Sequence, residues 1–230
     1  MALKLAARRL ARQGRLVSPR RGFFVIVPLE YKSAGSPPPS WFIDQLMHFE
    51  RERYYVGLLS AAALHSAAHQ QPQEFQVLTS RQMKPALAGR SRIHFLLKKT
   101  IKDIDAAPHK TETGTMRVST PETTALDLLR YSKHVGGLNS IATILSELAE
   151  RIDPKRLVET ARRFHDLPSA PRLGFLLERV EQAPKAQPLA DWLKSAPIRT
   201  IRLRTGSGRQ SGSKSARWKV IANEDVEAPE

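Results

Sequence analysis

The sequence has 230 residues, of which 41% are hydrophobic, so we expect one or two domains with a sizeable core. The absence of cysteine excludes disulfide scaffolds, thiolate zinc sites and cysteine nucleophiles. A count of 37 Lys and Arg against 22 Asp and Glu gives a net charge of +15, which favours a polyanionic partner.

Residues 3–13 predict an amphipathic helix that ends at Gly14. Apolar residues follow the spacing of one helical face: Leu3, Ala6, Ala7 and Leu10. The opposite face is basic, and residues 1–29 contain no acidic side chain. This segment lacks the apolar core of a secretory signal, and no apolar run in the chain could span a bilayer. We therefore expect a cytoplasmic protein without a membrane partner.

A basic-tipped hairpin is predicted directly after this helix. Residues 15–17 and 23–27 form the two strands, and Ser18–Gly22 form the turn. A helix followed by such a hairpin is typical of the recognition helix and wing of a winged helix-turn-helix, which contact DNA together. The predicted DNA-binding residues are Lys4, Arg8, Arg9, Arg12, Arg15, Arg20 and Arg21. Since the sequence begins inside or just before this helix, we expect a partial winged domain.

The rest of the chain is predicted to be a mixed β-sheet domain with flanking helices, so the fold class is α+β. Composition divides the chain into residues 1–30 (winged-helix remnant), 31–40 (Ser/Pro linker), 41–131 (helices and strands), 132–192 (helices), 193–223 (strands) and 224–230 (acidic tail). The predicted elements of the central part are a helix over 54–68, strands over 75–78, 93–97 and 116–118, and a helix from Pro121 capped by Ser119 or Thr120. Leu126, Leu129, Leu138 and Trp218 are predicted core residues.

Catalytic and metal-binding motifs are weak. Glu30-Tyr31-Lys32 has the local spacing of a metal-dependent nuclease, but no acidic residue precedes it. His65 and His69 have i, i+4 spacing without the glutamate and third ligand of a metalloprotease. Ser60, Ser66 and Thr79 lack a glycine-flanked nucleophile elbow. We therefore predict no enzyme activity, no metal and no cofactor.

A second basic surface is predicted near the carboxyl end. Residues 192–223 contain eight Lys and Arg and no acid, in a pattern that predicts edge strands with outward-facing bases. The residues concerned are Arg199, Arg202, Arg204, Arg209 and Lys214. Such bases can contact nucleic acid, but they also protect an exposed sheet edge from aggregation.

Two central runs, YYVGLLSAAALHSAAHQQPQEFQVLTSRQMKPALAGRSRIHFLLKK and MRVSTPETTALDLLRY, resemble the AbiEi family of antitoxins. Gly14 to Pro28 are similar to the hairpin that ends the family's winged domain, and Arg172 to Glu178 (RLGFLLE) to a late family helix. Residues 201–203 and 217–220, before Asn223, are similar to its C-terminal strands. The resemblance extends over nearly the whole chain.

The resemblance implies the antitoxin and transcriptional regulator of a type IV toxin–antitoxin system, a class associated with phage abortive infection. Such a protein represses its own operon by binding double-stranded promoter DNA, and counteracts a nucleotidyltransferase-like toxin without forming a stable complex with it. The alternative is an antitoxicity or interaction module with a degenerate winged helix that does not bind DNA. An RNA-binding function is suggested only by charge.

Overall fold

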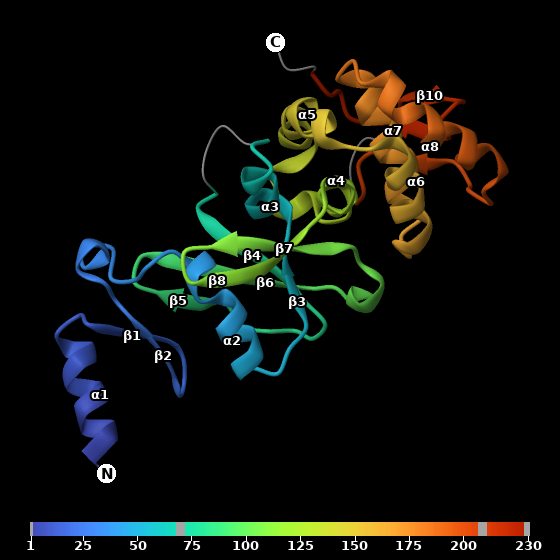
Figure 1. Ribbon diagram of the computed structural model, residues 1–230. Coiled ribbons are helices and arrows are strands. Elements are labelled where there is room, and N and C mark those ends of the chain that lie inside the picture. The colour runs from blue at the N-terminus through green and yellow to red at the C-terminus, as the bar shows by residue number, and fades with distance from the viewer. Residues whose placement is uncertain (1, 68–71, 207–210, 228–230) are drawn as a thin grey trace. The chain divides into compact units, whose positions relative to one another are not determined.

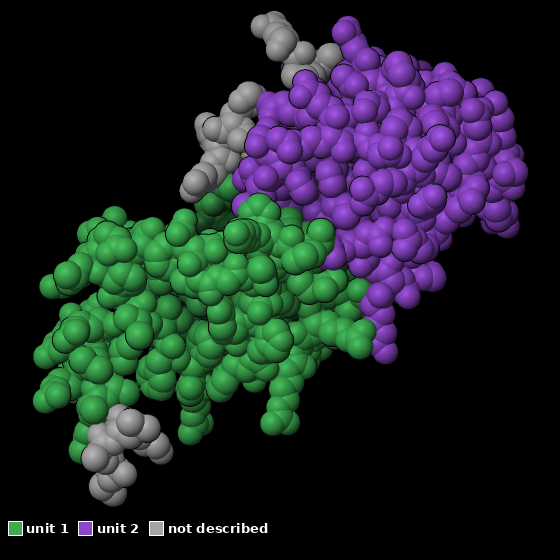
Figure 2. Space-filling view, in the orientation of Figure 1, with its two compact units in different colours: residues 1–56, 72–101, 107–118 green, residues 57–71, 102–106, 119–230 purple. Residues whose placement is uncertain are grey.

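The computed structural model describes residues 2–67, 72–206 and 211–227, with only the backbone of residues 2–4. The chain divides into two compact units (Figure 1, Figure 2). Unit 1 contains residues 1–56, 72–101 and 107–118; unit 2 contains residues 57–71, 102–106 and 119–230. Each unit is therefore assembled from segments that are distant in the sequence.

Unit 1 begins with the predicted helix and hairpin. Helix α1 (Ala2–Arg12) is followed by the antiparallel strands β1 (Leu16–Arg20) and β2 (Phe23–Ile26). Figure 1 shows α1 beside this hairpin and away from the larger sheet of the unit. A helix followed by a hairpin is confirmed, but β1 continues to Arg20, through most of the predicted turn, and the assignment to a winged helix-turn-helix stays a prediction.

Helix α1 ends as the glycine predicts. Gly14 has a φ of +69°, a left-handed conformation that favours glycine. The N–H of Gly14 donates to the carbonyl of Ala11, and the N–H of Arg15 donates to the carbonyl of Leu10. These two bonds form a Schellman motif, which turns the chain from the helix into β1.

The body of unit 1 is a six-stranded mixed sheet in the order β5-β6-β4-β3-β8-β7. Strands β4 and β6 pair in parallel, as do β3 and β8, whereas β3 and β4 are antiparallel, as are β5 and β6. The strands are β3 (Tyr54–Val56), β4 (Glu74–Thr79), β5 (Ala86–Ala88), β6 (Ser91–Leu97), β7 (Ala106–Thr111) and β8 (Gly114–Ser119). Helix α2 (Ile43–Phe49) buries Ile43, Leu46 and Met47. An α+β fold with a mixed sheet is thus confirmed.

The structure corrects the helix predicted over residues 54–68. Tyr54–Val56 form the buried strand β3, with β4 on one side and β8 on the other, and helix α3 spans only Leu58–Leu64. Aromatic and β-branched side chains suit a central strand. The extended backbone of Gly57 separates the strand from the helix.

The segment predicted as a Ser/Pro linker packs against the sheet. Ser36 and Pro37 are buried, and the N–H of Arg90 donates to the carbonyl of Ala34 at 2.9 Å. Gly89 has a positive φ, and a Cβ atom there would lie 2.3 Å from the same carbonyl. The segment is therefore seated on the β5–β6 turn rather than extended as a spacer, and the two compact units do not divide there.

Unit 2 consists of helices and a small sheet. The helices after α3 are α4 (Pro121–Arg130), α5 (Gly137–Leu148), α6 (Pro154–Arg163), α7 (Ser169–Arg179) and α8 (Ala183–Ser195). The sheet has the order β10-β11-β9 (Ser213–Ser215, Val220–Ala222 and Ile201–Arg202).

Short 3₁₀ turns occur along the whole described chain, at Leu29–Tyr31, Pro39–Trp41, Ile101–Asp103, Ser132–His134 and Ala149–Arg151. In the parts of the chain that the structure describes, no helix combines the length and apolar character needed to cross a bilayer.

The start of α4 agrees with its sequence signal. Thr120 is the N-cap residue and accepts a hydrogen bond from the N–H of Thr123, while Pro121 occupies the first turn. Glu122 accepts a bond from the N–H of Asp153 at 3.0 Å, which ties α4 to the start of α6. The core predictions are confirmed, since Leu126, Leu129, Leu138 and Trp218 are all buried.

Two motifs near the carboxyl end meet in the core of unit 2. A Cβ atom on Gly174 of α7 would lie 1.9 Å from the ring of Trp218, which is 1% exposed. The indole N–H of Trp218 donates to Glu178, one helical turn after Gly174, at 2.6 Å. The glycine makes room for the ring, and the glutamate satisfies its only polar atom.

We predict that Gly174→Ala destabilises the protein. Alanine favours helices over glycine by about 1 kcal/mol, but the clash with the buried indole should cost at least about 2 kcal/mol. The melting temperature should therefore fall. Thr143→Ala, at an exposed position of α5, is the control and should change it little. An equal or higher melting temperature for Gly174→Ala would contradict this packing.

Candidate nucleic-acid interface

Five arginines at the amino end are exposed, and none has a side-chain hydrogen bond or ion pair within the described residues. We call Arg8, Arg9, Arg12, Arg15 and Arg21 the cationic array. The first three lie on α1, Arg15 follows the helix, and Arg21 lies in the turn between β1 and β2. Guanidinium groups in such positions are available to phosphate oxygens.

Electrostatic repulsion within the array favours an anionic partner. Arg8 and Arg12 are spaced i, i+4, so their side chains lie on the same side of α1. Like charges at this spacing destabilise a helix by about 0.2–0.5 kcal/mol. Residues 1–29 contain no carboxylate to offset the repulsion locally, so a bound polyanion would relieve it.

The sequence predicts that Arg20 contacts DNA, but its side chain is directed to the protein and is only 19% exposed. Its guanidinium donates to the carbonyls of Lys84 and Pro85, the latter at 3.0 Å, and lies 3.5 Å from a carboxylate oxygen of Glu50. The same group stacks over the ring of Phe95, 5.3 Å from its centroid. Arg20 is therefore not free to contact DNA as the sequence predicts. Its protein partners already use the N–H donors and one face of the guanidinium that a phosphate would need.

The contacts of Arg20 join the hairpin to the rest of unit 1, and we call them the Arg20 clamp. Glu50 follows α2, Lys84 and Pro85 precede β5, and Phe95 lies on β6. A tilted contact between the rings of Phe23 and Phe49, with centroids 5.5 Å apart, adds a second link. The hairpin therefore has a defined position on this unit, and so has the array that it carries.

Apolar burial by α1 is small, although Val25 of β2 and the following Val27 are buried. Ala6, Ala7 and Leu10 of the predicted apolar stripe are half-buried, and the side chain of Leu3 lies outside the described part of the chain. Leu5 and Ile26 are 60% and 74% exposed. Because hydrophobic stabilisation follows buried area, this region depends more than the sheet does on the Arg20 clamp.

The remaining predicted basic residues have different surroundings. The side chain of Lys4 and the whole of Arg209 lie outside the described residues. Arg199, Arg202 and Lys214 are exposed, whereas Arg204 forms an ion pair with Glu224 at 2.8 Å. The array and the secondary basic surface belong to different units.

The residues weighed for catalysis or metal binding have ordinary surroundings. Residues 29–31 form a 3₁₀ turn, so Glu30 does not lie on a strand as a nuclease site would require. The Nε2 atom of His65 is 2.8 Å from the carbonyl of Ser119, and His69 lies outside the described residues. In the described part of the chain, no three acidic or histidine side chains are grouped to bind a metal.

Glu50 and Phe95 are important to this interface and are not identifiable from the sequence. They lie far from Arg20 along the chain and belong to elements whose local patterns do not suggest binding. No local signal separates Arg20 from Arg21, since the sequence predicts both in the turn, whereas the structure places Arg20 at the end of β1.

Comparisons with known proteins agree with this fold. The family model of the AbiEi antitoxin C-terminal domain matches residues 55–179, more than half of the chain. The crystal structure of the RV2827C protein from Mycobacterium tuberculosis is similar in fold, with a TM-score of 0.68 and 15% sequence identity over 95% of this chain and 78% of that one. No curated protein matches the sequence. On the family match, the chain belongs to the AbiEi antitoxin family.

Proposed function

We propose that this antitoxin binds the promoter DNA of its own operon through the cationic array and thereby represses transcription. The observation that carries the proposal is five exposed arginines, without protein partners among the described residues, on a helix and hairpin held by the Arg20 clamp. Arg8, Arg9 and Arg12 are assigned to the groove-facing helix, Arg15 to the phosphate backbone and Arg21 to the hairpin tip. Lys4 keeps its assignment as a phosphate contact, and Arg20 becomes a positioning residue.

The family supplies the other half of the function. An AbiEi antitoxin domain indicates an antitoxin role and hence a toxin partner. We further propose that the toxin is a nucleotidyltransferase-like enzyme and that the two proteins do not form a stable complex. Coexpression would rescue growth while co-purification recovers no complex.

The second candidate is an antitoxicity module that does not bind DNA. It is favoured by the match to residues 55–179, which excludes the array, and by the exposed apolar side chains of α1 and β2. Under this alternative, deleting residues 1–30 would preserve growth rescue, and the intact protein would show no preference for the promoter over a random duplex.

Promoter binding should weaken and become less dependent on salt in Arg8→Gln/Arg9→Gln/Arg12→Gln. Removing each phosphate contact lowers the steepness of log K against log salt by about 0.9. A fluorescence anisotropy titration across a salt series measures both quantities. The control is Arg151→Gln/Lys155→Gln/Arg156→Gln, which removes the same charge from exposed positions of unit 2. Equal salt slopes for the two variants would contradict the proposal.

The Arg20 clamp makes a separate prediction, in which two variants that change the net charge in opposite directions both weaken promoter binding. Arg20→Met and Glu50→Gln should each weaken promoter binding, because each releases the hairpin from unit 1. Loss of Glu50 removes a negative charge, so by charge alone it would strengthen binding to DNA. Weaker binding in both variants, with stability lowered by about 1–3 kcal/mol, therefore identifies positioning.

Glu112→Gln is the matched control, since Glu112 is an exposed acid of unit 1 without a described partner. It should bind promoter at least as well as the parent protein. Tighter binding by Glu50→Gln, in parallel with this control, would show that the clamp does not position the array.

A further inference from the structure

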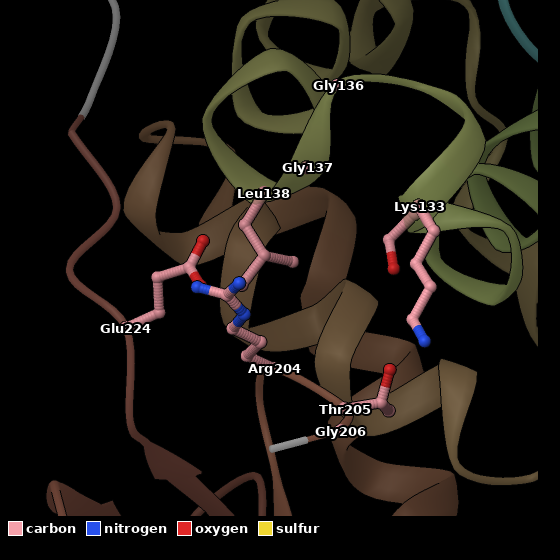
Figure 3. Close-up of a pocket in the computed structure, with 9 residues that line it drawn as sticks. Lys133, Gly136, Gly137, Leu138, Arg204, Thr205, Gly206 and Glu224 are labelled. Carbon is pink, nitrogen blue, oxygen red and sulfur yellow. The ribbon is translucent and has the colours of Figure 1, made fainter. Parts of the chain in front are cut away.

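Three segments of unit 2 that are distant in the sequence enclose a cavity of about 450 Å³ (Figure 3). They are the turn and helix start at residues 132–138, residues 204–206 after β9, and Glu224 after β11. Small-molecule sites in proteins have volumes of about 300–1,000 Å³. The cavity therefore has the size of a site for a small molecule.

The wall of the cavity at Arg204 has a fixed backbone. The N–H of Arg204 donates to Oδ1 of Asn223 at 2.9 Å, and Nδ2 of Asn223 donates to the carbonyl of Arg204 at 3.3 Å. Asn223 is buried, so water competes little for these two bonds. Close by, Nε of Arg172 donates to the carbonyl of Arg202 at 2.8 Å. This wall is thus held in place before a ligand binds, which lowers the entropy that binding costs.

Several hydrogen-bond donors of the lining are free. Figure 3 shows the amino group of Lys133 directed toward Thr205. Within the described residues, the side chains of Ser132, Lys133 and Thr205 have no hydrogen-bond partner. Gly136 and Gly137 line the cavity at the start of α5, where no side chain caps the first N–H groups of the helix. The cavity therefore brings together an ammonium group, two hydroxyl groups and backbone donors.

The lining also has a net positive charge. Its one carboxylate, Glu224, forms an ion pair with Arg204 at 2.8 Å. Lys133 has no acidic partner in the described part of the chain, so its charge is not compensated. The dipole of α5 adds a partial positive charge, and the first turn of this helix contains no acid. An anionic ligand is therefore favoured over a neutral or cationic one.

A phosphate monoester fits these donors better than a carboxylate. It has three terminal oxygen atoms that accept hydrogen bonds and carries close to two negative charges at neutral pH, whereas a carboxylate has two oxygen atoms and one charge. The rest of the ligand faces a polar lining, in which Leu138 is the one apolar side chain described. The lining contains no described aromatic ring on which a nucleobase would stack. These features favour a sugar over a base as the group that carries the phosphate.

We propose that this cavity binds a small sugar phosphate, with its phosphate group at Ser132, Lys133 and Thr205. The sugar hydroxyl groups lie toward the ion pair of Arg204 and Glu224, which offers both donors and acceptors. The inference goes beyond the proposed function and does not depend on it, because the cavity and the cationic array belong to different units.

Isothermal titration calorimetry of the full chain, with glucose 6-phosphate as the probe, tests this inference. Lys133→Gln should weaken binding about tenfold, because it removes a charge-assisted hydrogen bond. Glu224→Gln should strengthen binding, since it removes a carboxylate that repels the phosphate and partly neutralises Arg204. The matched control is Lys155→Gln, at an exposed position of α6 in the same unit, which should leave the affinity unchanged.

Four results would overturn the inference. They are no binding of glucose 6-phosphate at millimolar concentration, equal affinity of Lys133→Gln and the parent protein, weaker binding by Glu224→Gln, and equal affinity for glucose 6-phosphate and inorganic phosphate. The last result would leave no role for the sugar.

The inference and the proposed function can fail separately. Arg8→Gln/Arg9→Gln/Arg12→Gln should bind glucose 6-phosphate as the parent protein does, while its promoter binding reports on the array. Lys133→Gln should retain the promoter preference of the parent protein. Loss of that preference in Lys133→Gln, without a change in affinity for glucose 6-phosphate, would assign Lys133 to nucleic acid and overturn the sugar phosphate site.

Discussion

The guanidinium of Arg20 is the group on which the amino-terminal arrangement depends. It satisfies two carbonyls, an acid and an aromatic ring of unit 1 at once. Helix α1 has no buried side chain among its described residues, so burial of apolar surface contributes little to its position. Removing Arg20 takes a donor from the carbonyls of Lys84 and Pro85, whereas Glu50 keeps its ion pair with Arg81 at 2.9 Å. The Arg20 clamp thus gives the hairpin, and the basic residues that it carries, a defined position on unit 1.

Features set by neighbouring residues were predictable from the sequence. Gly14 ends α1 because glycine readily adopts the left-handed conformation that this turn requires. Thr120 and Pro121 begin α4 because the Thr120 side chain accepts a free N–H of the first turn and Pro121 has no N–H to satisfy. Features set by distant residues were not. Tyr54–Val56 became a strand because two other strands flank them, and Arg20 turned inward because Glu50 and Phe95 bind it there. Neither cause can be predicted from the residues that are neighbours in the sequence.

The carboxyl-end motifs that suggested the family acquire a physical meaning in unit 2. Gly174 lies under the indole of Trp218, and Glu178 accepts its N–H. The late helix and the strand segment that carries Trp218 therefore pack together as one unit. Gly89 has a comparable role in unit 1, where it admits the carbonyl of Ala34. These glycines support the fold, whereas the exposed arginines of the cationic array have no side-chain partner among the described residues.

Amide hydrogen exchange with and without promoter DNA tests the central claim most directly. We predict slower exchange in α1 and in the turn at Arg21 and Gly22 when the promoter is bound, with the segments around Glu50 and Phe95 protected in both states. Promoter binding that leaves exchange in α1 and the turn unchanged, or free protein in which the hairpin exchanges as an unfolded chain, would contradict it.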